Sequence, residues 1–261
     1  AALAALALLL VVGFHGAEER KTYQAPKFQF VRSFTNRPES LMFISDTTLL
    51  QSDAINIGWC AGNKDTPLAA LLSRMVRAAG VAVDATETLL AGHSAGGFSA
   101  ILVGSQVPNS HAVAMNAQSV VQRYEPWTVR NLHAAAFPEC ATIEEMTETY
   151  APRLDLRVGL KDRLPGTSFT LFANRTDQAS FGRLPHFPLL AEAFGLDQEA
   201  GGRTPTGDAF VPCEWGDGTI SGHALPGTIM PFLELALGER PGMEISHQVD
   251  PTWTRAVTVP A

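Results

Sequence analysis

Residues 92–96 read Gly-His-Ser-Ala-Gly, and the segments on either side of this pentapeptide narrow the possible folds. Residues 88–91 are predicted to end a buried strand, and residues 95–104 are predicted to form a tightly packed helix. A serine at such a sharp turn needs small residues two positions before and two positions after it. The turn lifts the hydroxyl out of the sheet and directs the positive end of the helix at the reacting carbon. This setting predicts that Ser94 is a nucleophile; a glycine-rich turn that only allows close packing is the alternative.

Strand-like and helix-like segments alternate along the chain, which predicts an α/β fold with a mostly parallel central sheet flanked by helices. The expected strands cover residues 8–14, 41–45, 86–91, 111–117, 168–173 and 210–213. The expected helices cover residues 67–79, 95–104, 143–150, 187–194 and 227–237. We expect a single domain over residues 1–261, with a lid-like insertion at about 119–165 and an irregular tail at about 239–261.

The helix at residues 67–79 has the clearest local signals. Thr66 can cap it, Pro67 suits the first helical position, and Gly80 suits the position after its end. Apolar residues recur on one face with helical spacing, so this helix is expected to pack against the sheet.

The composition limits the possible partners and cofactors. Of the 261 residues, 46% are hydrophobic, and the net charge is −7 without a basic run, so we expect a sizeable core and no nucleic-acid partner. Cys60, Cys140 and Cys213 are far apart and are expected to be buried free thiols, with one disulfide plus one free thiol as the alternative. Histidines and aspartates show no metal-ligand spacing, so we expect no metal and no organic cofactor.

The first twelve residues form an unbroken apolar run that is too short to span a bilayer as a helix. It could belong to a signal peptide, but no basic residues precede it, and we prefer a buried strand at residues 8–14. On this interpretation we expect a cytoplasmic protein without a stable membrane span; secretion is the alternative if a signal lies upstream. The sequence leaves the oligomeric state open.

The chain resembles the α/β-hydrolase family between about residues 6 and 237. The resemblance rests on Ser94 in its glycine-flanked turn, on His15-Gly16 after the first strand, and on the chain order serine, acid, histidine. Family members usually have two more strands before the strand that carries the His-Gly pair, and this chain departs from them there. The resemblance implies cleavage of a carboxylic ester through an acyl-serine. Acyl transfer by the same residues is the alternative, and a catalytically inactive binding module is a second alternative.

Acyl-serine chemistry passes through a tetrahedral oxyanion, which two preorganised backbone N–H groups would stabilise by about 3 kcal/mol each. The serine motif places one donor at Ala95, directly after the nucleophile. The resemblance suggests the amide of Ala17 as the second donor. His15 is then expected at the substrate-binding site, where its side chain would shape this loop by hydrogen bonding.

The resemblance also indicates the base and the acid among several candidates. His223, one of seven histidines, follows the last predicted strand in a glycine-containing loop, which is where the family keeps its base. Asp177 follows the strand at 168–173, at the family's usual place for the acid, and Asp217 is the second candidate. His93 is expected to point away from its neighbour Ser94, and is therefore not expected to be the base.

The predicted insertion carries the residues that bear on the substrate. Tyr124, Trp127 and Phe137 could line an apolar acyl pocket, or could simply pack the insertion against the body of the protein. Short runs at residues 14–16, 44–46, 58–59 and 116–118 resemble bacterial hydrolase-like proteins found beside polysaccharide-synthesis genes. Within the run at 44–46, Asp46 is expected to cap the following turn. This resemblance implies an acyl group on a sugar, so the expected partner is a small-molecule or glycan ester.

Overall fold

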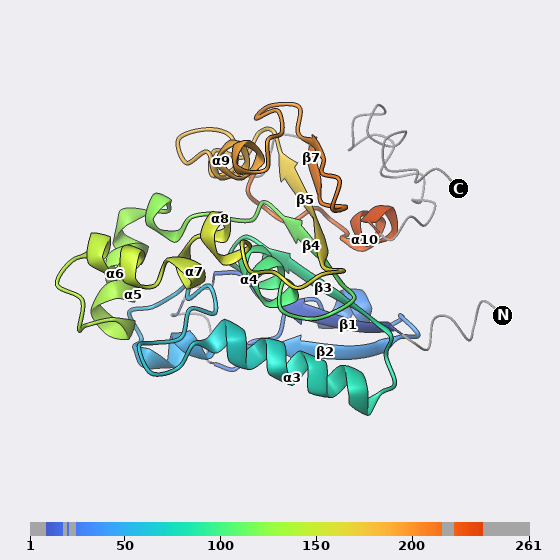
Figure 1. Ribbon diagram of the computed structural model, residues 1–261, viewed down its shortest axis with the longest axis horizontal. Coiled ribbons are helices and arrows are strands. Elements are labelled where there is room, and N and C mark those ends of the chain that lie inside the picture. The colour runs from blue at the N-terminus through green and yellow to red at the C-terminus, as the bar shows by residue number, and fades with distance from the viewer. Residues whose placement is uncertain (1–8, 18–19, 21–24, 216–221, 237–261) are drawn as a thin grey trace.

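The computed structural model describes residues 9–17, 20, 25–215 and 222–236. These residues form a seven-stranded sheet with the order β2-β1-β3-β4-β5-β7-β6 (Figure 1). Every neighbouring pair is parallel except β6 and β7, which are antiparallel. The strands are β1 Leu9–Phe14, β2 Ser40–Ile44, β3 Glu87–His93, β4 Ser110–Met115, β5 Ser168–Asn174, β6 Gly202–Arg203 and β7 Ala209–Cys213. The predicted α/β fold with a mostly parallel sheet is therefore confirmed.

Helices connect the strands and lie on both faces of the sheet. The α-helices are α2 Val31–Phe34, α3 Leu68–Ala82, α4 Ala95–Gly104, α5 Pro126–Ala136, α6 Ile143–Thr149, α7 Ala151–Leu154, α8 Leu156–Gly159, α9 His186–Ala193 and α10 Met230–Ala236. Two short 3-10 helices are η1 Thr47–Gln51 and η2 Val121–Arg123. None of these helices combines the length and the apolar composition that crossing a bilayer requires.

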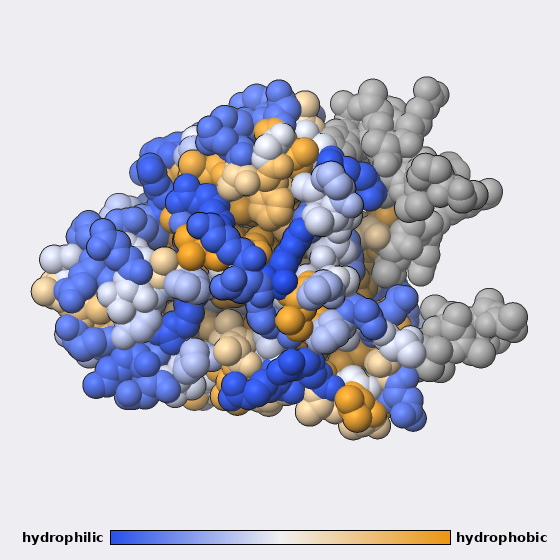
Figure 2. Space-filling model, viewed as in Figure 1, coloured by the Kyte–Doolittle hydropathy of each residue, from blue (hydrophilic) through white to orange (hydrophobic). Residues whose placement is uncertain are grey.

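Side chains alternate between two cores along each central strand, as the period of two in a β-strand requires. In β3, Leu90 packs into the core that includes α3 and α4, whereas Leu89 and Ala91 pack into the opposite core with α10. All ten residues of α4 are buried, so the helix that follows Ser94 is held firmly against the sheet. The surface in Figure 2 has a hydrophobic patch at the end of α3, where Val81 is 79% exposed.

The end of α3 differs from its prediction. Gly80 was expected just after the helix, but the helix continues to Ala82. The residue in the left-handed conformation after the helix is Asp84, with φ 53°, a position that aspartate tolerates better than most residues. At the other end, Pro67 precedes the first helical residue and no side chain caps the helix, so the predicted cap by Thr66 is wrong.

The segment predicted as an insertion, residues 119–165, contains η2 and the helices α5 to α8. Helix α5 contacts η1 after β2, and α6 contacts η2 after β4, so these helices lie near the carboxyl ends of the strands (Figure 1). Of these helices, only α6 was predicted. The tail at about 239–261 and residues 1–8 lie outside the described residues. Loops at the carboxyl ends of parallel strands are the usual place for a site in α/β proteins.

Candidate active site

Ser94 occupies the sharp turn between β3 and α4. Its backbone has φ 57° and ψ −123°, a strained conformation for a residue with a side chain. A Cβ added at Gly92 would lie 2.0 Å from the carbonyl oxygen of Gly96, which no side-chain rotation could relieve. The turn therefore depends on the glycine at position 92, as the motif requires.

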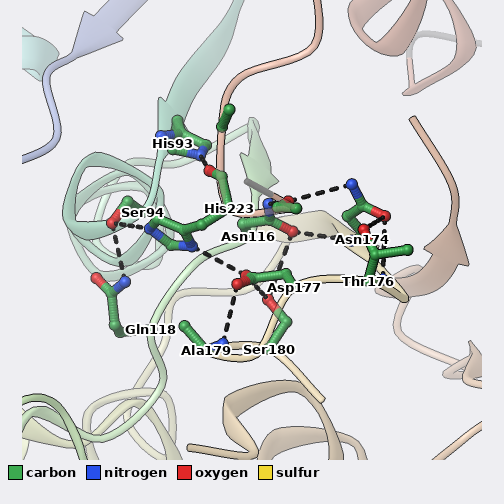
Figure 3. A network of polar contacts seen from close by, with 12 residues as sticks. His93, Ser94, Asn116, Gln118, Asn174, Thr176, Asp177, Ala179, Ser180 and His223 are labelled. Atoms are coloured by element: carbon green, nitrogen blue, oxygen red, sulfur yellow. Dashed lines mark hydrogen bonds and ion pairs between the residues drawn. The ribbon is translucent and has the colours of Figure 1, made fainter. Parts of the chain in front are cut away.

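The loop after β7 brings His223 to Ser94. Nε2 of His223 lies 2.9 Å from Oγ of Ser94, and Nδ1 of His223 lies 2.9 Å from Oδ2 of Asp177 (Figure 3). Because an ionised carboxylate only accepts hydrogen bonds, Nδ1 carries the proton, and Nε2 is left to accept the hydroxyl proton of Ser94. The structure thus brings together the three side chains predicted as nucleophile, base and acid, in the orientation needed for proton transfer.

Asp177 follows β5 and is held by its own loop. Its Oδ2 also accepts a hydrogen bond from Ser180 Oγ at 2.6 Å, and its Oδ1 accepts the amide of Ala179 at 2.9 Å. Burial alone would raise the pKa of Asp177, but the hydrogen bond and charge of His223, with the Ser180 and Ala179 donors, lower it below its usual value. The group beside the imidazole is therefore a carboxylate at neutral pH. The second candidate for the acid, Asp217, lies outside the described residues.

Two asparagines anchor the backbone on which His223 sits. The carbonyl oxygen of Gly222 accepts hydrogen bonds from Asn116 Nδ2 at 2.9 Å and from Asn174 Nδ2 at 3.1 Å (Figure 3). His93 donates from Nε2 to the carbonyl oxygen of His223 at 2.7 Å, and burial lowers the pKa of His93 to about 3. His93 is thus a neutral support for the loop at 223, consistent with the expectation that it is not the base.

The loop after β1 packs against the serine turn. A Cβ at Gly96 would lie 2.7 Å from the carbonyl oxygens of Phe14 and His15, so α4 begins in direct contact with this loop. His15 donates from Nδ1 to the Gly16 carbonyl at 2.7 Å and accepts the amide of Asp46 at Nε2 at 2.9 Å. Burial lowers the pKa of His15, and acceptance of the Asp46 amide at Nε2 requires the neutral imidazole. His15 therefore connects the loops that follow β1 and β2.

The amides predicted to bind an oxyanion are those of Ala95 and Ala17. Ala95 is the first residue of α4, and neither amide donates to a residue that the structure describes. Ala17 is exposed, at the end of the loop that contacts the serine turn.

One contact of Ser94 was not predicted. Gln118, after β4, donates from Nε2 to Ser94 Oγ at 2.9 Å, and its Oε1 accepts the indole N–H of Trp59 at 3.2 Å. Both residues belong to the short runs noted in the sequence, but nothing in those runs assigned them a role. A contact between residues 59, 94 and 118 depends on three separate loops, which no local pattern can reveal.

Asp46 caps η1 as expected, since its Oδ1 accepts the amide of Thr48 at 2.9 Å. Its Oδ2 also accepts the amide of Cys60 at 2.9 Å, which ties down the loop that carries Trp59. Cys60, Cys140 and Cys213 are free and buried, as predicted.

A cavity of about 450 Å³ adjoins the imidazole. It is lined by Tyr124, Glu125, Thr176, Asp177, Gln178, Ala179, Arg183, Leu184, Gly222 and His223. Tyr124 thus lies at the site and packs edge-on against Trp59, with ring centroids 5.7 Å apart. Trp127, on α5, is 48% exposed and is not part of this lining. A larger cavity, of about 530 Å³, opens at the amino-terminal edge of the strands near His111, away from Ser94.

The described residues hold no cluster of three or more histidine, cysteine, aspartate or glutamate side chains that could bind a metal ion.

Comparison with solved structures places this arrangement in a known fold. A capsule O-acetyltransferase of Neisseria meningitidis serogroup A matches with a TM-score of 0.55 and 15% identity, over 86% of this chain and 83% of that one. The glycosylation-associated protein (Gap123) complex from Streptococcus agalactiae matches with a TM-score of 0.54 and 13% identity, over 81% of this chain and 39% of that one. This chain has the α/β-hydrolase fold. No protein-family model and no curated protein matches the sequence.

Within the α/β-hydrolase fold, the contacts among Ser94, Asp177 and His223 lie at the carboxyl ends of the strands, after β3, after β5 and before α10. Six strands of the sheet, including all of those around the site, are parallel. Within the described residues, β2 is the edge strand next to β1.

Proposed function

We propose that this protein is an enzyme that cleaves a carboxylic ester through an acyl intermediate on Ser94. The observation that carries the proposal is the continuous contact from Ser94 Oγ to His223 Nε2 and from His223 Nδ1 to Asp177 Oδ2, each 2.9 Å long. A serine hydroxyl is a weak nucleophile at neutral pH, and an adjacent imidazole with a carboxylate behind it is the arrangement that activates it.

In the first half-reaction, Ser94 Oγ bonds to the acyl carbon while its proton moves to His223 Nε2. The imidazolium then gives that proton to the departing alcohol oxygen, and Asp177 stabilises the charged ring. In the second half-reaction an oxygen nucleophile gives its proton to His223 and attacks the acyl-serine carbon. The bond between that carbon and Ser94 Oγ then breaks, and His223 passes the proton to Oγ. The amides of Ala95 and Ala17 are suited to hold the oxyanion, at about 3 kcal/mol per donor.

The acyl acceptor decides between two related activities. With water as the acceptor, the protein is an esterase. With a sugar hydroxyl as the acceptor, the protein is an acyltransferase. The structural likeness to a capsule O-acetyltransferase is the reason to test this second activity. One solved form of that acetyltransferase is a complex with CoA, so a CoA thioester is a reasonable acyl donor to test here. Tyr124, in the cavity beside His223, is the aromatic residue best located to contact the acyl or sugar group.

The primary test is covalent labelling of Ser94 by a fluorophosphonate, measured by intact mass spectrometry. We expect one adduct on the wild-type chain, none on Ser94→Ala, and strongly slowed labelling of His223→Ala. Ser105→Ala is the matched control. Ser105 directly follows α4, the helix that begins after Ser94, and its hydroxyl donates to the carbonyl of Leu102. A folded wild-type chain that takes up no adduct would be a binding module and would contradict the proposal.

The second test separates the two acceptors. Wild-type protein that the fluorophosphonate labels is given p-nitrophenyl acetate or acetyl-CoA, with and without an added oligosaccharide. The products are identified by mass spectrometry. Free acetate at a rate that the oligosaccharide does not alter supports the esterase. Acetylated oligosaccharide that requires Ser94 supports the transferase.

A further inference from the structure

A single row of hydrogen bonds runs through the site and extends beyond Ser94, His223 and Asp177. Trp59 Nε1 donates to Gln118 Oε1 at 3.2 Å, and Gln118 Nε2 donates to Ser94 Oγ at 2.9 Å. The row continues from Ser94 to His223 and ends at Asp177. Trp59 and Gln118 are both buried, at 0% and 1% exposure, so water does not compete for these bonds.

The direction of every bond in this row is determined by its two ends. An indole N–H can only donate, so it must face the oxygen of the Gln118 amide, and the NH₂ of that amide must face Ser94. At the other end an ionised carboxylate can only accept. Because Ser94 Oγ already accepts from Gln118, its single proton is directed at Nε2 of His223.

We infer that Gln118 is an additional catalytic residue, which donates a hydrogen bond to the reacting oxygen of Ser94, and that Trp59 is a positioning residue that sets the orientation of the Gln118 amide. This inference rests on the proposed function. Its physical basis is that a hydrogen bond to an oxygen that carries charge is stronger than one to a neutral oxygen.

The donor acts whenever charge builds on Ser94 Oγ. During acylation the hydroxyl proton leaves for His223 as the bond to the acyl carbon forms, and the oxygen is transiently more negative than in the free hydroxyl. During deacylation the bond between Oγ and the acyl carbon breaks, and the departing oxygen is again negative until His223 returns the proton. Gln118 would stabilise both transition states more than the resting enzyme, which is what raises a rate.

The loop that carries Trp59 is built to hold it in place. Trp59 and Cys60 both have φ 52°, a left-handed conformation that non-glycine residues rarely adopt. The buried carboxylate of Asp46 accepts the Cys60 amide at 2.9 Å. Tyr124 packs against the indole from the side of the cavity. Strain of this kind persists only where surrounding contacts enforce it, and here those contacts aim one N–H at Gln118.

The test measures the second-order rate of Ser94 labelling by a fluorophosphonate in wild type and variants. Gln118→Leu removes the donor and is expected to label about tenfold more slowly. Trp59→Phe replaces the indole by a smaller aromatic ring without the N–H and is expected to label about threefold more slowly. The double variant is expected to be no slower than Gln118→Leu, because Trp59 acts through Gln118. Gln106→Leu, which alters an exposed amide at the far end of α4, should match wild type.

Gln118→Glu tests the donor role through the pH dependence of the labelling rate, which a purely structural role of Gln118 would leave unchanged. Its protonated carboxyl can donate to Ser94, whereas its ionised form accepts the Ser94 proton and turns it away from His223. The labelling rate of this variant, divided by the wild-type rate, should therefore fall as pH rises between about 5 and 9. The same ratio for Gln118→Leu should not depend on pH.

The outcomes separate this inference from the proposed function. If wild type is not labelled, both are wrong. If wild type is labelled and folded Gln118→Leu and Gln118→Glu label at the wild-type rate throughout the pH range, only the role of Gln118 is overturned. If Trp59→Phe slows labelling further in the Gln118→Leu background, Trp59 does not act through Gln118.

Discussion

Replacing Asp177 by asparagine tests the electrostatic part of the site most directly. Both carboxylate oxygens of Asp177 accept hydrogen bonds, Oδ1 from the Ala179 amide and Oδ2 from Ser180 and His223. An asparagine has only one acceptor oxygen. If that oxygen keeps the Ala179 amide, the NH₂ faces His223, and Nδ1 must become an acceptor. Nε2 would then carry the proton and could no longer take one from Ser94.

The expected loss can be worked from the geometry. The Nδ1 to Oδ2 distance of 2.9 Å puts the centres of the imidazolium and carboxylate charges about 4 Å apart. At an effective dielectric constant of about 20 this attraction is about 4 kcal/mol. The side chain of Asp177 is 1% exposed, whereas that of His223 is 26% exposed, so solvent screens part of this energy. Since about 1.4 kcal/mol corresponds to a tenfold change in rate, we expect Ser94 to react roughly 100- to 1000-fold more slowly.

The assay is the rate of Ser94 phosphonylation at pH 7.5, with circular dichroism to show that each variant is folded. Asp197→Asn is the matched control. Asp197 is a surface residue whose Oδ1 also accepts nearby backbone amides, those of Glu199 and Ala200, but it has no contact with the site. A folded Asp177→Asn chain that labels within about threefold of wild type would refute the assignment of Asp177 as the acid.

Two further predictions concern stability. Burial lowers the pKa of His93 and His186 to about 3 and of His111 to about 4, so the unfolded chain binds protons below pH 6.5 that the folded chain does not. The free energy of unfolding is therefore highest above pH 6.5 and falls on acidification, by about 2 kcal/mol per histidine at pH 5. Urea unfolding at pH 7.5 and at pH 5 measures this difference. Gly92→Ala puts a Cβ against backbone and should destabilise the fold by about 3 kcal/mol or more, whereas Gly80→Ala, with open space around it, should be neutral or stabilising by up to about 1 kcal/mol.

Controls for these two predictions come from the same structure. His111 bonds to the hydroxyls of Ser168 and Thr170, and His111→Gln should reduce the stability difference between the two pH values by about 2 kcal/mol. An unchanged difference would show that His111 is not held neutral. Equal stability of Gly92→Ala and Gly80→Ala would mean that the serine turn tolerates a side chain and that its described geometry is wrong.

Local sequence patterns were enough to predict the strands that carry the site and the helix after Ser94, but among η2 and the helices α5 to α8 they predicted only α6. The strand before Ser94 and the helix at residues 95–104 follow from hydrophobic runs and from the glycines of the turn, because steric limits act between neighbours in the chain. The same patterns predicted that the helix ends before Gly80, whereas it continues to Ala82 through residues that are exposed. They missed β6, whose two residues pair with β7 and have no periodicity of their own.

The sequence by itself predicted a strained serine turn at the carboxyl end of a buried parallel strand. The resemblance to the α/β-hydrolase family then indicated Asp177 and His223 at later strand ends. Only the tertiary structure decided which atoms meet there. The amide of Gln118 reaches Ser94 because the loops after β2, β3 and β4 converge, and the indole of Trp59 orients that amide from 59 residues away in the chain. Hydrogen bonds of this kind depend on distances between loops to within a few tenths of an ångström, and such distances are set by the packing of the whole sheet rather than by any one segment.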